Sequence, residues 1–147
     1  MKIREFNNND LLKIYEIELD SFSTPYTLNT LQQLYDIGAG FLVAEEKGQV
    51  IAYIIFWLKT EEEGQIVSLA VDKNFRGENV GSALLQRAIN VYKMFEINII
   101  KLEVESKNKK AIEFYEKFGF KVDEVLFHYY EDESNGIRMK LDLRESQ

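Results

Sequence analysis

Residues Arg76-Gly77-Glu78-Asn79-Val80-Gly81-Ser82-Ala83-Leu84-Leu85 form the stretch from which the fold is predicted. The apolar run Ile66–Val71 stands ahead of this stretch and is typical of a buried strand. Apolar residues then recur at helical spacing, at Leu84, Ala88, Val91 and Phe95, which predicts a helix over Val80–Phe95. A strand, a glycine-bearing turn and a helix N-terminus together favour phosphate, because the first N–H groups of a helix lack internal partners and its dipole attracts anions.

The turn itself has the chemistry that a pyrophosphate needs. Gly77 and Gly81 keep side chains away from the backbone, and Arg76 adds a positive charge. Asn79 tolerates the left-handed backbone that such a turn requires. No Lys-Ser or Lys-Thr pair follows the last glycine, and the full G-x-G-x-x-G spacing is missing, so a Walker A loop and a dinucleotide site are both unsupported. A purely structural turn is the alternative.

A second informative segment runs from Leu102 to Phe120. It predicts a strand end followed by a helix over Asn108–Phe118, which stops at Gly119 with Phe120 beyond it. Its pattern is N-x-x-A-x-x-x-Y-x-x-x-G-F, made by Asn108, Ala111, Tyr115, Gly119 and Phe120.

The two segments together resemble the GNAT family of N-acetyltransferases, in particular its ribosomal-protein alanine and archaeal amino-terminal types. The family's loop signature is R/Q-x-x-G-x-G/A, and this chain has Asn79 where the family usually has glycine. The resemblance implies a single domain over residues 1–147 and acetyl-CoA as the co-substrate. It also implies an α/β fold of mixed α+β type, with a central sheet of about seven strands flanked by about four helices. The sheet would be splayed between the strands Gln65–Val71 and Asn98–Val104.

The remaining elements follow from periodicity and turn residues, in the order β-α-α-β-β-β-α-β-α-β-β. The other predicted strands are Lys2–Phe6, Gly40–Glu46, Gln49–Lys59, Lys121–Tyr130 and Gly136–Leu143. The other predicted helices are Asp10–Leu19, capped by Asn9 or Asp10, and a short one that Thr27 caps and that runs through Leu31, Leu34 and Tyr35. Lys47-Gly48 marks a hairpin, and Glu61–Gly64 is predicted to be an acidic loop.

Composition excludes several classes of function. The formal net charge of −7 argues against nonspecific binding of nucleic acid and is compatible with a cationic acceptor. The chain has no cysteine and a single histidine, His128, so we expect no metal site. The longest apolar run, Val50–Leu58, is too short to span a bilayer as a helix. No signal-peptide pattern begins the chain, so we expect a cytoplasmic protein without membrane contact.

Acetyl transfer to an amine needs a base, because only the neutral amine attacks and an α-amino group has a pKa of about 7.7–8.0. Glu103, at a strand end, is the predicted general base. Glu105 shares its face, so the choice between them rests on the resemblance. Tyr115 is the predicted general acid for the leaving thiolate, since a phenol stays protonated at neutral pH. The alternatives are a solvent-facing glutamate and a core tyrosine packed with Phe114 and Phe118.

The resemblance also implies the binding residues. Backbone groups of Leu69, Ala70 and Val71 would contact the pantetheine, with Tyr115 beside the sulfur. The pyrophosphate would lie against Arg76, Gly77, Glu78, Asn79, Val80, Gly81 and Ser82. Asn108 would bind the pantetheine arm or only cap its helix. Pro25 and Tyr26 would form one wall of the acceptor groove, and Tyr129 and Tyr130 would hold the acceptor's backbone; an aromatic strand end is the alternative for this pair.

The sequence therefore predicts an acetyl-CoA-dependent Nα-acetyltransferase acting on protein amino termini by direct attack within a ternary complex. A ribosomal protein is one candidate acceptor, and the expected state is a monomer or a homodimer. An acetyltransferase of a small amine or a lysine side chain is the first alternative. A catalytically inactive acyl-CoA-binding module is the second.

Overall fold

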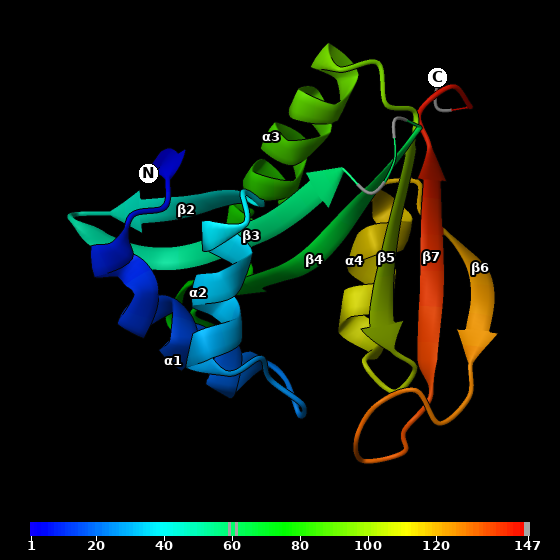
Figure 1. The fold of residues 1–147 in the computed structure, drawn as a ribbon, viewed down its shortest axis with the longest axis horizontal. Helices are drawn as coiled ribbons and strands as arrows, with labels where there is room; N and C mark the ends of the chain where they lie inside the picture. Colours follow the sequence, from blue (N-terminus) through cyan, green and yellow to red (C-terminus); the bar gives the residue numbers. More distant parts are fainter. Residues whose placement is uncertain (59, 61, 146–147) are drawn as a thin grey trace. The chain divides into compact units, whose positions relative to one another are not determined.

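The computed structural model describes residues 1–58, 60 and 62–145 (Figure 1). Its strands are β1 Lys2–Glu5, β2 Gly40–Glu46, β3 Gln49–Leu58, β4 Glu63–Val71, β5 Ile99–Glu105, β6 Lys121–Leu126 and β7 Gly136–Asp142. Its helices are α1 Leu11–Ser21, α2 Leu28–Asp36, α3 Val80–Met94 and α4 Lys109–Lys117, with 3-10 turns η1 Asn8–Asp10 and η2 Lys73–Phe75. The strands are hydrogen-bonded in the order β1-β2-β3-β4-β5-β7-β6. The predicted mixed α/β architecture is confirmed.

The chain divides into two compact units. Unit 1 holds Met1–Trp57 and Val67–Val91, and unit 2 holds Leu58–Ile66 and Tyr92–Gln147. The first residues of β4 thus belong to unit 2 and its last residues to unit 1, whereas α3 begins in unit 1 and ends in unit 2. That residues 1–147 fold as one domain stays a prediction.

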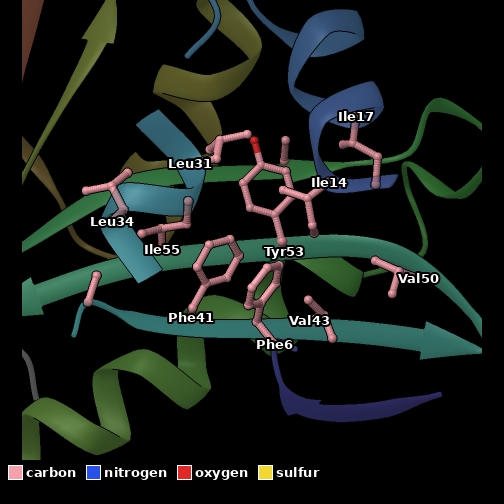
Figure 2. Packing of buried hydrophobic residues seen from close by; sticks show 12 residues of the cluster. Phe6, Ile14, Ile17, Leu31, Leu34, Phe41, Val43, Val50, Tyr53 and Ile55 are labelled. Carbon is pink, nitrogen blue, oxygen red and sulfur yellow. The ribbon is translucent and has the colours of Figure 1, made fainter. Parts of the chain in front are cut away.

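In unit 1, α1 and α2 cover one face of the β2–β3 hairpin (Figure 2). Tyr53 of β3 lies at the centre of this cluster, and Phe6 stacks on Phe41 with ring centroids 4.1 Å apart. Trp57, the one tryptophan of the chain, packs against the same cluster. Residues Val50–Phe56 are all buried, so β3 is covered on both faces, as its uninterrupted apolar sequence predicts.

In unit 2, β7 lies between β5 and β6 (Figure 1). β4 and β5 are parallel from the pair Glu63–Ile99 to the pair Ile66–Leu102, and β5 and β7 are antiparallel along their whole length. The helix α4 ends as predicted: Gly119 has a φ of 102°, and the N–H groups of Gly119 and Phe120 donate to the carbonyls of Glu116 and Tyr115.

The predicted acidic loop Glu61–Gly64 is partly wrong, because Glu63 and Gly64 open β4. Gly64 is a packing glycine and not a turn glycine: a Cβ added there would lie 2.2 Å from Cε1 of Tyr92. Glu61, and Lys59 at the predicted end of β3, lie outside the described residues.

Two helix predictions also need correction. Asn7, and not Asn9 or Asp10, caps the chain's first helical turn, because an added 3-10 turn precedes α1 and Asp10 serves as the reciprocal partner in that cap. In α3 the buried residues are Val80, Leu84, Leu85, Ala88, Ile89 and Tyr92, whereas Phe95 is 63% exposed because the helix ends one residue before it.

Candidate active site

The predicted phosphate-binding turn lies in unit 1, between β4 and α3. Asp72 caps η2 by accepting the N–H of Asn74 at 2.9 Å, and the chain then turns twice through left-handed backbone, at Gly77 with φ 84° and at Asn79 with φ 64°. Asn79 therefore adopts the conformation for which glycine is usual, as expected for asparagine. The helix α3 begins directly after it at Val80, so Gly81 lies in the first turn, where N–H groups lack partners.

Arg76 is fixed against its own unit. Its Nε donates to the carbonyl of Val71 at 3.0 Å, and its Nη2 donates to Oγ of Ser21 at 3.2 Å. The guanidinium thus joins the end of β4 to the end of α1. Its side chain is about half exposed, which leaves part of the positive charge at the surface.

The strand end Leu69–Val71 has alternating burial: Ala70 is buried, and Leu69 and Val71 are partly exposed. Ser68, just before it, takes part in a buried polar cluster that was not among the predicted features. Glu18 of α1, only 1% exposed, accepts hydrogen bonds from the Tyr53 hydroxyl and, at 3.1 Å, from Ser68 Oγ. Glu18 stands four residues after the buried Ile14, and an acidic residue on an apolar stripe was the available signal.

The same carboxylate fixes the segment that contains Pro25 and Tyr26. Oε2 of Glu18 accepts the backbone N–H of Tyr26 at 3.0 Å, whereas the Tyr26 side chain is 39% exposed. Burial raises the pKa of Glu18, although the hydrogen bonds from Tyr53, Tyr26 and Ser68 act in the opposite direction. The loop between α1 and α2 is therefore anchored to the core through one buried acid.

This raised pKa predicts a pH-dependent stability. The folded protein holds the proton of Glu18 more tightly than the unfolded chain does, so this contribution is complete below the unfolded pKa of about 4.3 and is lost as the pH rises through the folded value. The free energy of unfolding of Glu18→Gln, relative to that of the wild type, should therefore increase from about pH 4 to about pH 7. The expected increase is about 1.4 kcal/mol for each unit by which the folded pKa of Glu18 exceeds the unfolded one. Urea unfolding at both pH values measures it.

The matched control for Glu18→Gln is Glu16→Gln, on the same helix, where the side chain is 70% exposed. Its stability relative to the wild type should be the same at both pH values. If Glu18→Gln differs from the wild type in unfolding free energy by the same amount at both pH values, the raised pKa of Glu18 is contradicted.

Glu103, the predicted base, lies on β5 in unit 2 with a donor on each carboxylate oxygen. The hydroxyl of Tyr129 donates to Oε1 at 2.5 Å, and Nη2 of Arg138 donates to Oε2 at 2.8 Å. Its side chain is 19% exposed, so it is reachable from solvent. The rival glutamate, Glu105, lies 3.8 Å from Nζ of Lys107. The structure thus brings Glu103 and Tyr129 together.

A small cavity of about 80 Å³ opens beside Glu103 in unit 2. Its lining is polar and includes an ion pair between Lys101 and Glu63, 3.3 Å apart. The full lining is Glu63, Gln65, Lys101, Leu102, Glu103 and Arg138. A cavity of this size and polarity can hold a few water molecules but no large ligand.

The predicted strand over Lys121–Tyr130 is wrong at its end, because β6 stops at Leu126. Tyr129 and Tyr130 lie in the loop between β6 and β7, where both of their N–H groups donate to the carbonyl of Ser134. These local hydrogen bonds replace a strand ladder. The two rings pack edge to face with centroids 5.1 Å apart, and Tyr129 is 48% exposed.

Tyr115, the predicted acid, lies on α4 and is 8% exposed. Its ring packs edge to face against Phe114 and Phe120, with centroids 5.1 Å and 5.5 Å away. Burial raises the pKa of Tyr115, so its phenol stays protonated at neutral pH. Asn108 caps α4: its Oδ1 accepts the N–H of Ala111 at 3.2 Å, as the capping alternative predicts.

Within residues 1–58, 60 and 62–145, no group of three or more His, Cys, Asp or Glu side chains is arranged to hold a metal ion. Across the same residues, no helix has the length and apolar character needed to cross a membrane.

The two informative sequence segments and the order of the strands are those of a single family. The profile of the acetyltransferase (GNAT) family matches residues 11–120. This chain belongs to the GNAT family. It is an N-acetyltransferase, and the resemblance stated from Asn108, Tyr115 and the turn at Gly77–Gly81 is confirmed.

Named relatives of this GNAT chain cover nearly its whole length. It is 34% identical to an N-alpha-acetyltransferase of Sulfurisphaera tokodaii, over 89% of this chain and 84% of that one. It is 30% identical to a putative [ribosomal protein bS18]-alanine N-acetyltransferase of Bacillus subtilis, over 88% and 87%. The crystal structure of Ard1 from Thermoplasma volcanium matches with a TM-score of 0.93 and 32% identity, over 97% of each chain.

Proposed function

We propose that this chain transfers the acetyl group of acetyl-CoA to the α-amino group of protein amino termini. The observation that carries the proposal is the hydrogen bond from Tyr129 to Glu103, 2.5 Å long. It joins the loop predicted to hold a peptide backbone to the residue predicted to take the amine's proton. Relatives with N-alpha-acetyltransferase in their names support the same reading.

In the proposed mechanism both substrates are bound together and no protein nucleophile is needed, because a thioester is already activated. Glu103 accepts a proton from the acceptor's ammonium group, directly or through a water in the adjoining cavity. The neutral nitrogen attacks the thioester carbonyl carbon, and the positively charged nitrogen of the resulting tetrahedral intermediate then loses a proton to solvent. The C–S bond then breaks, Tyr115 gives its phenolic proton to the leaving sulfur, and the phenol is reprotonated from solvent.

Further parts of the proposal concern the surroundings of the reaction. Acetyl-CoA would lie with its pyrophosphate at the N-terminus of α3, with Leu69 to Val71 along its pantetheine. A ribosomal protein is a candidate acceptor, by analogy with the Bacillus relative. We further propose a cytoplasmic location and a monomeric or homodimeric state.

The test is a panel of short peptides and small amines incubated with acetyl-CoA, with thiol release as the readout. Each peptide is paired with a version whose α-amino group is blocked and which keeps an internal lysine. Acetylation of the free peptides alone supports the proposal. Acetylation of the blocked peptides or of small amines would favour the other acceptor classes, and binding of acetyl-CoA without any transfer would favour an inactive module.

The pyrophosphate assignment predicts the behaviour of Gly81→Glu. An acidic residue in the first turn suits the helix dipole, so the variant should fold. Its side chain and charge would oppose the phosphates, and we expect a loss of acetyl-CoA affinity by a factor on the order of 10–10², measured by calorimetry. Gln86→Glu adds the same charge at an exposed position of α3 and serves as the control. Unchanged binding by Gly81→Glu would remove the assignment.

Tyr129→Ala separates peptide acceptors from small amines. Tyr129→Ala removes a donor from Glu103 for both acceptor types. Losing contacts to a peptide backbone should in addition raise the apparent KM for peptides, relative to that for small amines, by roughly three- to tenfold, the size of a lost hydrogen bond. Phe127→Ala, in the same loop and 73% exposed before substitution, is the control. Equal effects of Tyr129→Ala on both acceptor types would remove the reason for preferring protein amino termini.

A further inference from the structure

Each of three adjacent strands of unit 2 contributes one charged side chain to a single row across the sheet. Register pairs Glu103 of β5 with Arg138 of β7, and Arg138 with Glu124 of β6. Nη2 of Arg138 donates to Glu103 at 2.8 Å, and Nη1 donates to Glu124, also at 2.8 Å. One guanidinium therefore serves two carboxylates on opposite sides.

The row depends on an irregularity in β6. The register shifts between Val122 and Glu124, so Asp123 has no partner in the register and Glu124 faces Arg138. An extra residue of this kind re-aims the side chains that follow it. Without it, Asp123 would face Arg138.

The two donors on Glu103 differ in how firmly they are held. Arg138 comes from the middle of β7, which is paired on both sides, and its side chain is 28% exposed. Tyr129 comes from a loop and is 48% exposed. An arriving amine can therefore replace the Tyr129 hydroxyl as the donor to Oε1 of Glu103, whereas Arg138 keeps its hydrogen bond to Oε2.

We infer that Arg138 is a positioning residue for Glu103, because it orients the carboxylate and places a positive charge against it, and that Glu124 limits this effect by sharing the guanidinium. The inference rests on the proposed function of Glu103 as the base. No sequence signal pointed to Arg138 or Glu124, because their roles follow from strand register. The hydrogen bond to Glu103 raises the pKa of Arg138, so the guanidinium remains charged throughout the working range.

The other charged groups near Glu103 are themselves largely paired. On β5 itself, Lys101 forms an ion pair with Glu63 of β4, and Glu105 forms one with Lys107. On β7, Lys140 is the register partner of Lys101. The combined charge of these groups does not change when Arg138 or Glu124 is replaced. Arg138 and Glu124 thus have opposite expected effects on the same carboxylate.

The experiment measures kcat/KM against pH for a peptide with a free amino terminus, in the wild type, Arg138→Gln and Glu124→Gln. Arg138→Gln should move the midpoint of the acidic limb upward by about one pH unit, the low end for an adjacent opposite charge at a partly exposed site. Glu124→Gln should move it downward by about half a unit. Arg138→Lys keeps the charge without the planar fork and should restore most of the midpoint but only part of the rate.

Arg144→Gln is the matched control, because Arg144 forms an exposed ion pair with Asp142, 2.9 Å away, just beyond the same strand. It should leave the limb unchanged. Shifts in the same direction for Arg138→Gln and Glu124→Gln, or a loss of rate at every pH with an unmoved limb, would overturn the inference.

A second readout separates this inference from the proposed function. The side-chain carboxyl of Glu103 can be titrated by carbon NMR in the same variants, without any acceptor. If Arg138→Gln and Glu124→Gln move the titration midpoint of Glu103 in opposite directions, the electrostatic coupling is supported. This holds even if the wild type acetylates no peptide, because that absence of activity would contradict only the proposed function. If the titration midpoint of Glu103 is the same in all variants, the inference is overturned, even when the enzyme acetylates peptides and the proposed function stands.

Discussion

Glu103→Gln is expected to lower turnover by a factor on the order of 10²–10⁴, the usual contribution of a positioned general base. Glutamine keeps the shape of the side chain but removes the charge that accepts the amine's proton. The acidic limb of the pH–rate profile should disappear or move with it. Steady-state rates with a saturating peptide across the pH range measure both effects.

The matched control is Glu105→Gln, two residues along the same strand, which tests the rival base directly. It should keep the wild-type limb. If Glu103→Gln matches the wild type in both rate and profile, Glu103 is only a surface residue in an ion pair. If water substitutes for the direct contact, the loss should fall at the lower end of the range.

Tyr115→Phe should lower turnover by a factor of about 10² and leave acetyl-CoA affinity nearly constant. The substitution keeps a buried ring that packs against Phe114 and Phe120 and removes only the proton donor. A loss confined to turnover is the pattern of an interaction made in the transition state. Single-turnover kinetics and calorimetry give the two quantities.

Tyr92→Phe controls for the loss of a buried hydroxyl. Tyr92 is fully buried and its hydroxyl donates to the carbonyl of Gln65 at 3.1 Å, so its removal should cost about 1 kcal/mol of stability and spare turnover. Survival of full activity in Tyr115→Phe would make Tyr115 a packing residue.

Local sequence patterns were sufficient for the elements that local physics controls. The stop of α4 at Gly119 needs a positive φ that glycine supplies, and Asn79 takes the same backbone region before α3. The buried strand β3 follows from an apolar run too short for a membrane helix. Glu103 and Tyr115 came from a residue-by-residue resemblance and not from periodicity.

Contacts between distant segments were beyond the sequence. The aromatic run at Phe127–Tyr130 predicts a strand, but hydrogen bonds to Ser134 close it into a loop. Glu18 becomes a buried anchor only because α1, β3 and β4 meet around it. Arg138 contacts Glu103 and Glu124 through a register that an extra residue in β6 sets, and single-sequence patterns do not fix register.

The position of Trp57 gives the protein a built-in optical reporter. The indole packs against the cluster of α1, α2, β2 and β3, so its fluorescence emission follows the packing of unit 1. Circular dichroism of the amide bonds, in contrast, averages over helices and strands of both units. Following both signals through one denaturant titration asks whether they change together, which is the accepted spectroscopic criterion for a single cooperative domain.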